Sequence, residues 1–341
     1  MLKSYKEDDS VKKLLITGAA GFIGTNCALQ LANEYEIFLI DDFSRSGSEL
    51  NELVLNKSGF EVSNVDISNR SDLYQFLESI NHLDGILNLA AQTSLLESYK
   101  DPLRDFQSNA LGTINLLDYM KNRIPDCKGI FLSSNKVYGD LSQLDYSRNE
   151  DRFVPSNGVI SYDESMPLLP KGGYSISKCI GDMYVQEYGR RYGINASSLR
   201  QSAVYGPFQN PRSDQGWVAY FLKELVSGNR VALRGEGLQV RDILYVDDFV
   251  GLVRKLLKND VEPGEFFNVG GGPENSLSIL ELFRLLKEIT GKNLNYVTGA
   301  MSSEDQKYFV SDNSKISMAT GWLPSISPET GVRAILERSQ E

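Results

Sequence analysis

The sequence is poor in histidine and cysteine. Its 341 residues include one histidine, His82, and three cysteines, Cys27, Cys127 and Cys179. A single histidine excludes metal centres built from several imidazoles and argues against a Ser-His-Asp nucleophile, so we predict no metal site and no chemical role for His82. Three distant cysteines without a CxxC pair favour a reduced, cytoplasmic protein over a disulfide framework.

Long apolar runs are also missing. No stretch of the sequence approaches the roughly 20 uncharged apolar residues of a membrane span, and residues 1–13 are charged rather than signal-peptide-like. The 35 basic and 45 acidic residues give a net charge of −10. This balance disfavours nonspecific binding to nucleic acid, whose phosphates it would repel. We therefore expect no nucleic-acid partner and no membrane partner.

Short apolar runs alternate with helical patterns through the first half of the chain. This alternation predicts an α/β fold with a doubly wound parallel (Rossmann) sheet, whose ligands bind at the carboxyl ends of the strands. The predicted strands are 13–17, 36–40, 60–65, 85–89, 129–132 and 195–199, and the predicted helices between them are 22–33, 71–80, 103–122 and 174–192.

The chain is predicted to have two domains. Residues 1–203 form the Rossmann domain, and the polar, proline- and glycine-rich segment 140–173 is an irregular insertion in it. Residues 204–341 mix further helices and short strands, as expected for a smaller α/β substrate region. Parts of 244–270 are expected to pack back on the Rossmann domain.

Three glycines, Gly18, Gly21 and Gly24, lie between the first predicted strand and helix. They permit a tight turn and close approach to a pyrophosphate, and the helix N-terminus supplies free N–H groups. Asp41 ends the second strand about twenty residues on, where a carboxylate can accept ribose hydroxyls and repel a 2′-phosphate. The pattern favours NAD over NADP, although Arg45 could accommodate that phosphate. A turn-capping acid is the structural alternative for Asp41.

Tyr174 and Lys178 lie four residues apart, so they share one face of the predicted helix. With a pKa of about 10, a tyrosine is a poor base unless nearby positive charge stabilises its phenolate. A fixed Lys178 ammonium supplies such charge and can also hold a nicotinamide ribose. Ser134, at the end of the fifth strand, can orient a substrate hydroxyl toward Tyr174. An ordinary helix with a buried tyrosine, and a serine that caps a turn, are the structural alternatives.

Together with TGAAGFIG (17–24), these motifs resemble the extended short-chain dehydrogenase/reductase superfamily, in its nucleotide-sugar epimerase and dehydratase branch. Other matching stretches are LNLAAQ (87–92), SSNKVYGD (133–140), YSISK (174–178), VYGP (204–207), VRDILYVDD (240–248) and NVGGG (268–272). The resemblance implies an enzyme with tightly bound NAD that oxidises a sugar transiently and reduces it on the other face.

The resemblance also implies where NAD is held. Asp66 could contact the adenine, or cap the helix that follows it. The cofactor residues implied are Gly18, Gly21, Phe22, Ile23, Gly24, Asp41, Asp42, Asp66, Ile67, Leu89, Ala90, Ala91, Asn109, Tyr174 and Lys178, with Ser134, Tyr174 and Lys178 as the catalytic set.

Substrate contacts follow from the same resemblance and from charge. Arg241 is the leading pyrophosphate ligand, because arginine binds phosphate bidentately. For Trp217, core packing is an equal alternative. The substrate residues implied are Gln92, Ser134, Asn135, Lys136, Gln209, Gln215, Trp217 and Arg241.

Three stretches, 134–140, 157–165 and 214–221, resemble 2-epimerases of CDP-linked dideoxyhexoses, which serve lipopolysaccharide O-antigen biosynthesis. The related 4,6-dehydratases carry an Asp-Glu pair after the active-site hydroxyl, whereas this chain has Asn135 and Lys136, which argues against a dehydratase. Superfamily members commonly pair helices corresponding to 103–122 and 174–192, so a homodimer or higher homo-oligomer is expected.

Three alternatives stay open at this point. One is a 4-epimerase of a UDP- or GDP-sugar, and a second is a net NAD-dependent sugar-nucleotide dehydrogenase or reductase. The third is a noncatalytic NAD-sensing module, against which the complete set of Ser134, Tyr174 and Lys178 argues.

Overall fold

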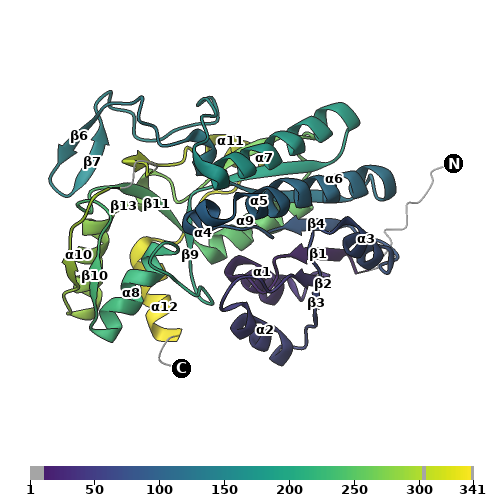
Figure 1. Ribbon diagram of the computed structural model, residues 1–341, viewed down its shortest axis with the longest axis horizontal. Coiled ribbons are helices and arrows are strands. Elements are labelled where there is room, and N and C mark those ends of the chain that lie inside the picture. Colours follow the sequence, from purple (N-terminus) through teal and green to yellow (C-terminus); the bar gives the residue numbers. More distant parts are fainter. Residues whose placement is uncertain (1–10, 302–304, 339–341) are drawn as a thin grey trace.

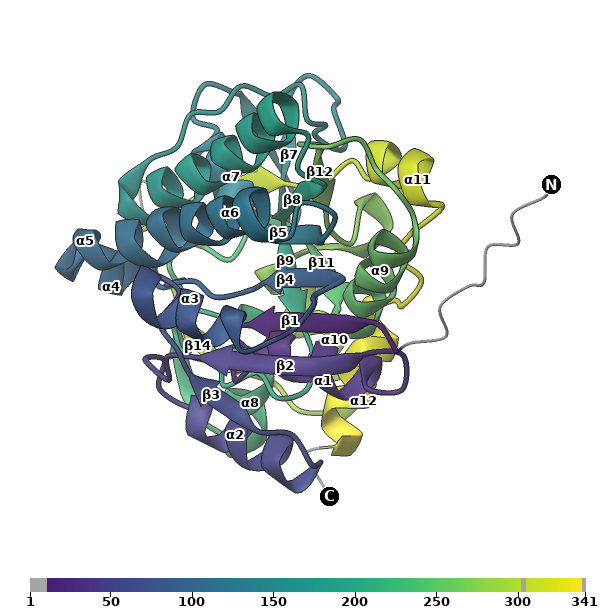
Figure 2. The same ribbon diagram turned by 90° about the vertical axis from the view of Figure 1, so that its right-hand side faces the viewer.

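A computed structural model describes residues 11–301 and 305–338 of the chain. Residues 1–10, on which part of the signal-peptide prediction rests, lie outside this range. A seven-stranded parallel sheet forms the centre of the fold (Figures 1 and 2). Its strands, in spatial order, are β12 (Phe266–Val269), β8 (Ala196–Gln201), β5 (Lys128–Ser134), β4 (Gly85–Asn88), β1 (Lys13–Thr17), β2 (Glu36–Asp41) and β3 (Val62–Asn64).

Helices cover both faces of this sheet, which explains why its strands are nearly continuous apolar runs. On β1, Leu14 and Ile16 pack into one apolar cluster and Leu15 into the cluster of the opposite face. The Rossmann fold class is thereby confirmed. One layer contains α1 (Phe22–Leu31), α2 (Ser48–Lys57), α9 (Val246–Lys258) and α11 (Ser314–Thr320), and the other contains α3 (Arg70–Glu78), α6 (Gly112–Arg123) and α7 (Gly172–Tyr192).

The edge strand β12 comes from the last third of the chain. It pairs in parallel with β8, with Phe267 opposite Leu199, and its Asn268 is fully buried. Helix α9, which precedes β12 in the chain, packs on α1. The central sheet is therefore completed by residues well beyond 203.

The remaining C-terminal elements gather beyond the carboxyl ends of the central strands, on the left of Figure 1. A second sheet is built around β11 (Val240–Tyr245), which pairs with β9 (Ala203–Tyr205), β13 (Ser276–Ser278) and β15 (Tyr308–Phe309). The pair β10 (Arg230–Ala232) and β14 (Asn295–Val297) and the helices α8 (Trp217–Ser227), α10 (Ile279–Thr290) and α12 (Pro328–Arg338) complete this region.

Several segments differ from the sequence predictions, and α2 was not predicted. The helix predicted for 103–122 is instead α5 (Pro102–Asp105), a π-helical turn (Phe106–Leu111) and α6. Within the segment 140–173, β6 (Tyr146–Asn149) and β7 (Arg152–Pro155) form an antiparallel hairpin. A short helix α4 (Leu95–Lys100) precedes α5. Across the described residues, the search for a helix both long and apolar enough to span a membrane finds none.

Candidate functional site

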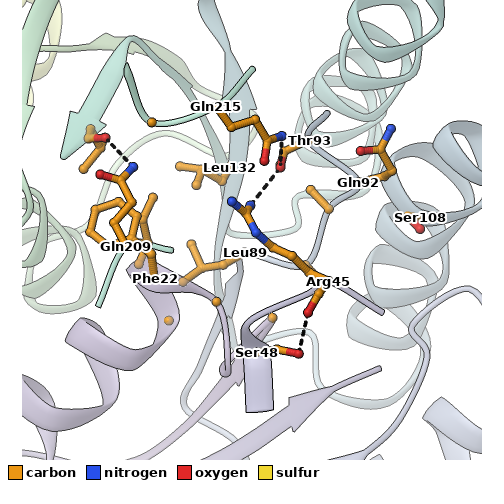
Figure 3. A pocket seen from close by; sticks show the side chains of 18 of the residues that line it. Phe22, Arg45, Ser48, Leu89, Gln92, Thr93, Ser108, Leu132, Gln209 and Gln215 are labelled. Atoms are coloured by element: carbon orange, nitrogen blue, oxygen red, sulfur yellow. Dashed lines mark hydrogen bonds between the residues drawn. The ribbon is translucent and has the colours of Figure 1, made fainter. Parts of the chain in front are cut away.

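A cavity of about 300 Å³ lies at the carboxyl ends of the central strands (Figure 3). Its wall brings together most of the residues predicted from the sequence. These are Gly18, Gly21, Phe22, Ile23, Gly24, Asp41, Asp42, Asp66, Ile67, Leu89, Ala90, Ala91, Tyr174 and Lys178 from the cofactor set and Gln92, Gln209, Gln215 and Trp217 from the substrate set. Asn109, Ser134, Asn135, Lys136 and Arg241 are not part of this wall.

The glycine turn at the floor of the cavity leaves no room for side chains. Gly18 has a φ of +65°, and a Cβ on it would lie 2.7 Å from the backbone nitrogen of Ala90. Helix α1 begins directly after Gly21, and in the described structure no side chain caps its first turn. Its N–H groups are therefore available to an anion in the cavity. A turn of this shape fits a dinucleotide pyrophosphate.

Asp41, the last residue of β2, holds the turn and also faces the cavity. Its two carboxylate oxygens accept hydrogen bonds from the backbone N–H groups of Ala20 (2.9 Å) and Phe43 (2.8 Å). Burial raises its pKa to about 6, against the lowering effect of those two backbone hydrogen bonds. Asp41 therefore caps the turn, as one sequence interpretation predicts. It also lines the cavity, and its contact with an adenosine ribose stays a prediction.

Arg45 follows β2 on the loop to α2 and extends across the cavity. Its guanidinium donates a hydrogen bond of 3.0 Å to the hydroxyl of Thr93 (Figure 3). Burial, and then the nearby Arg212, lower its pKa, while Asp214 and Asp41 oppose that shift. The guanidinium of Arg45 is thus hydrogen-bonded to Thr93 of the cavity wall rather than to Asp41.

The other predicted acids have partners of their own. Asp42 accepts a hydrogen bond from Arg104 (3.1 Å) and from the hydroxyl of Ser44. Asp66 accepts from the backbone N–H of Ser68 (2.8 Å) while it lines the cavity. The alternative that Asp66 caps helix α3 is wrong, because Asn69 is the residue whose side chain caps that helix.

Tyr174 lies in the first turn of α7, where its backbone N–H donates to the hydroxyl of Ser98 (2.8 Å). Burial raises the pKa of its phenol, a hydrogen bond with Ser134 lowers it, and the charge of Asp105 raises it again. Ser134, at the end of β5, therefore contacts the phenol, although it is not one of the residues that line the cavity. The two predicted catalytic oxygens come together from a strand end and a helix start.

Lys178 is buried one turn after Tyr174, in the wall of the cavity. Its ammonium donates a hydrogen bond to the backbone carbonyl of Leu132 on β5. Burial lowers its pKa to about 8, although the charge of Asp182 acts in the opposite direction. The sequence analysis predicted that this ammonium stabilises the phenolate of Tyr174; the contact that lowers the tyrosine pKa in the structure comes from Ser134 instead.

Asn109 lies in the π-helical turn, behind the wall of the cavity. Its amide donates to the backbone carbonyl of Gln92 (3.0 Å) and to the hydroxyl of Ser177 on α7 (2.9 Å). Gln92 itself is tied to Ser94 and to the buried Asp105. The structure places Asn109 as a support for Gln92 rather than as a residue of the cavity wall.

Two cations predicted to bind substrate converge on one carboxylate oxygen. Lys136 (3.2 Å) and the guanidinium of Arg241 (2.6 Å) both contact Oδ1 of Asp305. Burial would raise the pKa of Asp305, but Lys136 and then Arg241 outweigh it and hold the pKa below its ordinary value. Beside them, the amide of Asn135 donates to Gln306 (2.9 Å).

The outer wall of the cavity is formed by the segment between β9 and α8. Gln215 donates to Thr93 (2.9 Å), the same hydroxyl that Arg45 contacts (Figure 3). Gln209 and Trp217 also line the cavity, and Trp217 packs partly against the C-terminal apolar cluster. Both interpretations of Trp217, cavity wall and core, therefore describe its position.

Hydrogen bonds from three asparagine side chains connect the segment between β9 and α8 to the Rossmann domain. Asn26 donates to the carbonyl of Pro207 (2.9 Å), Asn51 to that of Phe208 (3.2 Å), and Asn210 to that of Gly47 (2.8 Å). We call residues 207–216 the strap. Because the strap is anchored beside the glycine turn, it closes one side of the cavity.

The sequence analysis missed several residues of the wall. Thr93 and Gln201 follow or end strands β4 and β8, so their positions at the carboxyl ends of predicted strands were a usable signal. Asp305 carried no such signal, because it lies in a loop before β15. Among the described residues, no group of three or more His, Cys, Asp or Glu side chains could hold a metal ion.

Comparisons with known proteins agree with this geometry. A family model described as the NAD dependent epimerase/dehydratase family matches residues 14–270. A CDP-paratose 2-epimerase from Salmonella typhi is 35% identical over 95% of this chain and 98% of its own length. A UDP-glucose 4-epimerase from Thermotoga maritima, solved with UDP-glucose, has a TM-score of 0.83 and 29% identity over 96% of this chain and 100% of its own. A UDP-glucuronic acid 4-epimerase from Bacillus cereus, solved with UDP-glucuronic acid and NAD, has a TM-score of 0.81 and 27% identity over 96% and 99%.

Proposed function

The chain belongs to the NAD dependent epimerase/dehydratase family, and from this premise we propose that it inverts one carbon of a nucleotide sugar. The sugar is oxidised transiently to a keto sugar and reduced again from the opposite face. We propose a CDP-linked dideoxyhexose of the CDP-paratose type as substrate and C2 as the inverted carbon. The single observation that carries the proposal is the hydrogen bond between Ser134 and Tyr174 at a glycine-lined cavity whose wall also includes Lys178.

The choice of an epimerase over a dehydratase rests on the two residues after Ser134. Elimination of water needs an acid and a base, whereas Asn135 carries an amide and Lys136 an ammonium. In the structure both are held by other side chains, Asn135 by Gln306 and Lys136 by Asp305. The choice of CDP and of C2 is supported by the 35% identity with the CDP-paratose 2-epimerase.

NAD is the cofactor of this family, and solved relatives contain it. The residues that would hold it are the glycine turn with the first turn of α1 for the pyrophosphate and Asp41 for the adenosine ribose. Lys178 and Tyr174 face the other end of the cavity. When bound, NAD supplies a hydride acceptor that can return the hydride to the sugar.

The protein's own groups manage the proton of the reacting hydroxyl. The phenolate of Tyr174 accepts that proton, and the phenol so formed returns it at the end of the cycle. Because burial raises the tyrosine pKa, the phenolate needs support, and the Ser134 hydroxyl supplies a hydrogen bond to it. Ser134 also holds the sugar oxygen in place, and the carbonyl of Leu132 anchors Lys178.

A turnover assay tests this proposal. The full chain is supplied separately with CDP-, UDP- and GDP-sugars, and NMR identifies which carbon changes configuration. We expect inversion at C2 of the CDP-sugar and a constant absorbance at 340 nm. Inversion at C4 of a UDP- or GDP-sugar would assign a 4-epimerase. Absorbance that changes in proportion to sugar consumed would assign a net dehydrogenase or reductase, and no turnover of any sugar would contradict the proposal.

We also propose that the protein acts in the cytoplasm as a homodimer, paired through the segments 103–122 and 174–192. Apolar side chains of α5, the π-helical turn and α7, which are neighbours, are exposed, including Leu103 (62%), Phe106 (45%), Ile176 (46%) and Met183 (56%). Exposed apolar patches of this kind are typical of interfaces. A second copy of the chain would cover them by the same surface on both subunits.

A further inference from the structure

Gln201 is a residue of the cavity wall that has no role in the proposed mechanism. It is the last residue of β8 and lies in register with Ser134, the last residue of β5. Register partners on adjacent parallel strands project their side chains to the same face of the sheet. Gln201 is therefore placed beside the catalytic hydroxyl, at the same edge of the sheet.

The side chain of Gln201 ends at a buried oxygen. Gln201 lines the cavity together with Leu132, Tyr174 and Lys178. Its Oε1 is buried, and within the part of the chain that the structure describes it has no hydrogen-bond partner. Leaving a buried carbonyl oxygen unpaired destabilises the protein, so such an atom in a cavity wall points to a ligand that donates a hydrogen bond.

Neighbouring polar groups are already engaged. The hydroxyl of Ser202 donates to Asp242, and the ammonium of Lys178 donates to the Leu132 carbonyl. The other unpaired buried atoms of the cavity belong to Tyr205, Gln209 and Trp217, which lie toward the strap. Gln201 thus offers a buried, unpaired acceptor to a ligand in the cavity that Tyr174 and Lys178 also line.

A carboxamide is the chemical group that best matches a glutamine side chain. Each has one carbonyl acceptor and an NH₂ donor, so two such groups can form a pair of parallel hydrogen bonds. We propose that Gln201 binds the nicotinamide carboxamide of NAD, with Oε1 accepting from the carboxamide NH₂. This inference rests on the proposed function, which places the nicotinamide end of NAD beside Tyr174. Gln201 would then fix which face of the ring is turned toward the sugar.

The test compares NAD with 3-acetylpyridine adenine dinucleotide, in which a methyl group replaces the carboxamide NH₂. Both dinucleotides are titrated into the full chain cleared of retained cofactor, and their dissociation constants are measured by calorimetry. Wild-type protein is expected to prefer NAD by about fivefold or more, the ratio that one neutral hydrogen bond supplies. In Gln201→Met the preference should fall to within about twofold.

Two further variants sharpen the comparison. Gln201→Glu retains an acceptor oxygen and should retain the preference for NAD. Gln143→Met, at an exposed position outside the cavity wall, should behave as wild type. Circular dichroism verifies that each variant is folded.

The outcomes separate this inference from the proposed function. An unchanged NAD preference in Gln201→Met would overturn the inference. A loss of nucleotide-sugar affinity alone would also overturn it and would assign Gln201 to the substrate. If wild-type protein bound neither dinucleotide, the proposed function itself would fail.

Discussion

The ammonium of Lys178 donates a hydrogen bond to the backbone carbonyl of Leu132, two residues before Ser134 on β5. This contact ties helix α7 to the strand that carries the catalytic hydroxyl. It also confines a cation to a site where burial lowers its pKa to about 8. The lysine is therefore held in place at a cost to the stability of the protein.

Replacing this lysine should reveal that cost. Below about pH 8, Lys178 is charged in both the folded and the unfolded protein, so the folded state carries the full burial penalty. As pH rises from about 8 toward 10.5, the ordinary pKa of a lysine, the folded lysine becomes neutral while the unfolded one is still charged, and the penalty is progressively lost. We expect Lys178→Met to raise the free energy of unfolding by about 1–3 kcal/mol at neutral pH.

Urea unfolding of the NAD-free protein across this pH range measures the effect. The gap between variant and wild type should close as pH rises, because the wild-type penalty disappears. Lys223→Met, at an exposed position on α8, serves as the control and should show no such trend. A gap that is constant with pH, or a less stable Lys178→Met, would contradict the assignment.

Removing the phenolic oxygen of Tyr174 should abolish turnover without unfolding the protein. Tyr174→Phe preserves the ring and the backbone hydrogen bond to Ser98. Because proton transfer by a positioned side chain contributes about 10²–10⁴-fold, kcat should fall by at least about 100-fold. Initial rates followed by NMR measure this loss, with Tyr184→Phe, exposed on the same helix, as the control. Full activity in folded Tyr174→Phe would refute the mechanism.

Selectivity for NAD over NADP should depend on pH through Asp41. Above about pH 6 its carboxyl is ionised and repels the 2′-phosphate of NADP. Below about pH 6 the carboxyl is protonated, so the repulsion is lost and selectivity should fall. Dissociation constants of both dinucleotides, measured between about pH 5 and about pH 8, test this. Asp41→Asn should show selectivity that is low and independent of pH; an unchanged wild-type ratio below pH 6 would contradict the role of Asp41.

Neutralising Arg241 should weaken nucleotide-sugar binding but leave NAD binding intact. Charge-assisted hydrogen bonds contribute about 1.5–3 kcal/mol, so Arg241→Gln should raise the dissociation constant of the sugar nucleotide by about 10- to 100-fold. Calorimetry with the substrate analogue CDP measures the change. Arg230→Gln, exposed at the start of β10, is the matched control. Equal affinity in Arg241→Gln and wild type would remove Arg241 from the substrate site.

A charge placed on the exposed face of α5 or α7 should dissociate the dimer. Leu103→Glu and Met183→Glu each introduce a carboxylate into the proposed interface, where it would be buried without a partner. Sedimentation at micromolar concentration should show a wild-type dimer and monomeric variants. Met318→Glu changes a methionine that is 81% exposed on α11 and should remain dimeric. A wild-type monomer at that concentration would contradict the proposal.

Local signals were sufficient to predict much of the fold and of the cofactor wall. Strand β1 has the predicted bounds, and the glycine turn and Asp41 lie where strand-turn-helix spacing places them. In a parallel sheet, the carboxyl ends of the strands meet at one edge, so residues such as Asp41 and Gln92 could be assigned to one cavity from the sequence. The fold class and the family assignment are confirmed on this basis.

Contacts between residues that are far apart in the sequence could not be predicted from local sequence patterns. The pairing of Arg241 and Lys136 with Asp305 joins three segments that are far apart in the sequence. The π-helical turn around Asn109 needs one extra residue within a helix, which hydrophobic periodicity does not register. Gln201 was overlooked because the predicted strand ended at residue 199, two residues before the observed end of β8. Its register with Ser134 is visible only in the assembled sheet.

The position of β12 in the sequence has a consequence for the synthesis of the protein. Strand β8 ends at Gln201, and its edge partner β12 begins only at Phe266. During synthesis, β8 is therefore an unpaired edge strand until more than sixty further residues have left the ribosome. An unpaired edge strand invites pairing with other chains. A chain that is truncated before β12, by ribosome stalling or by proteolysis, would therefore be prone to aggregate and would not form a stable dinucleotide-binding domain.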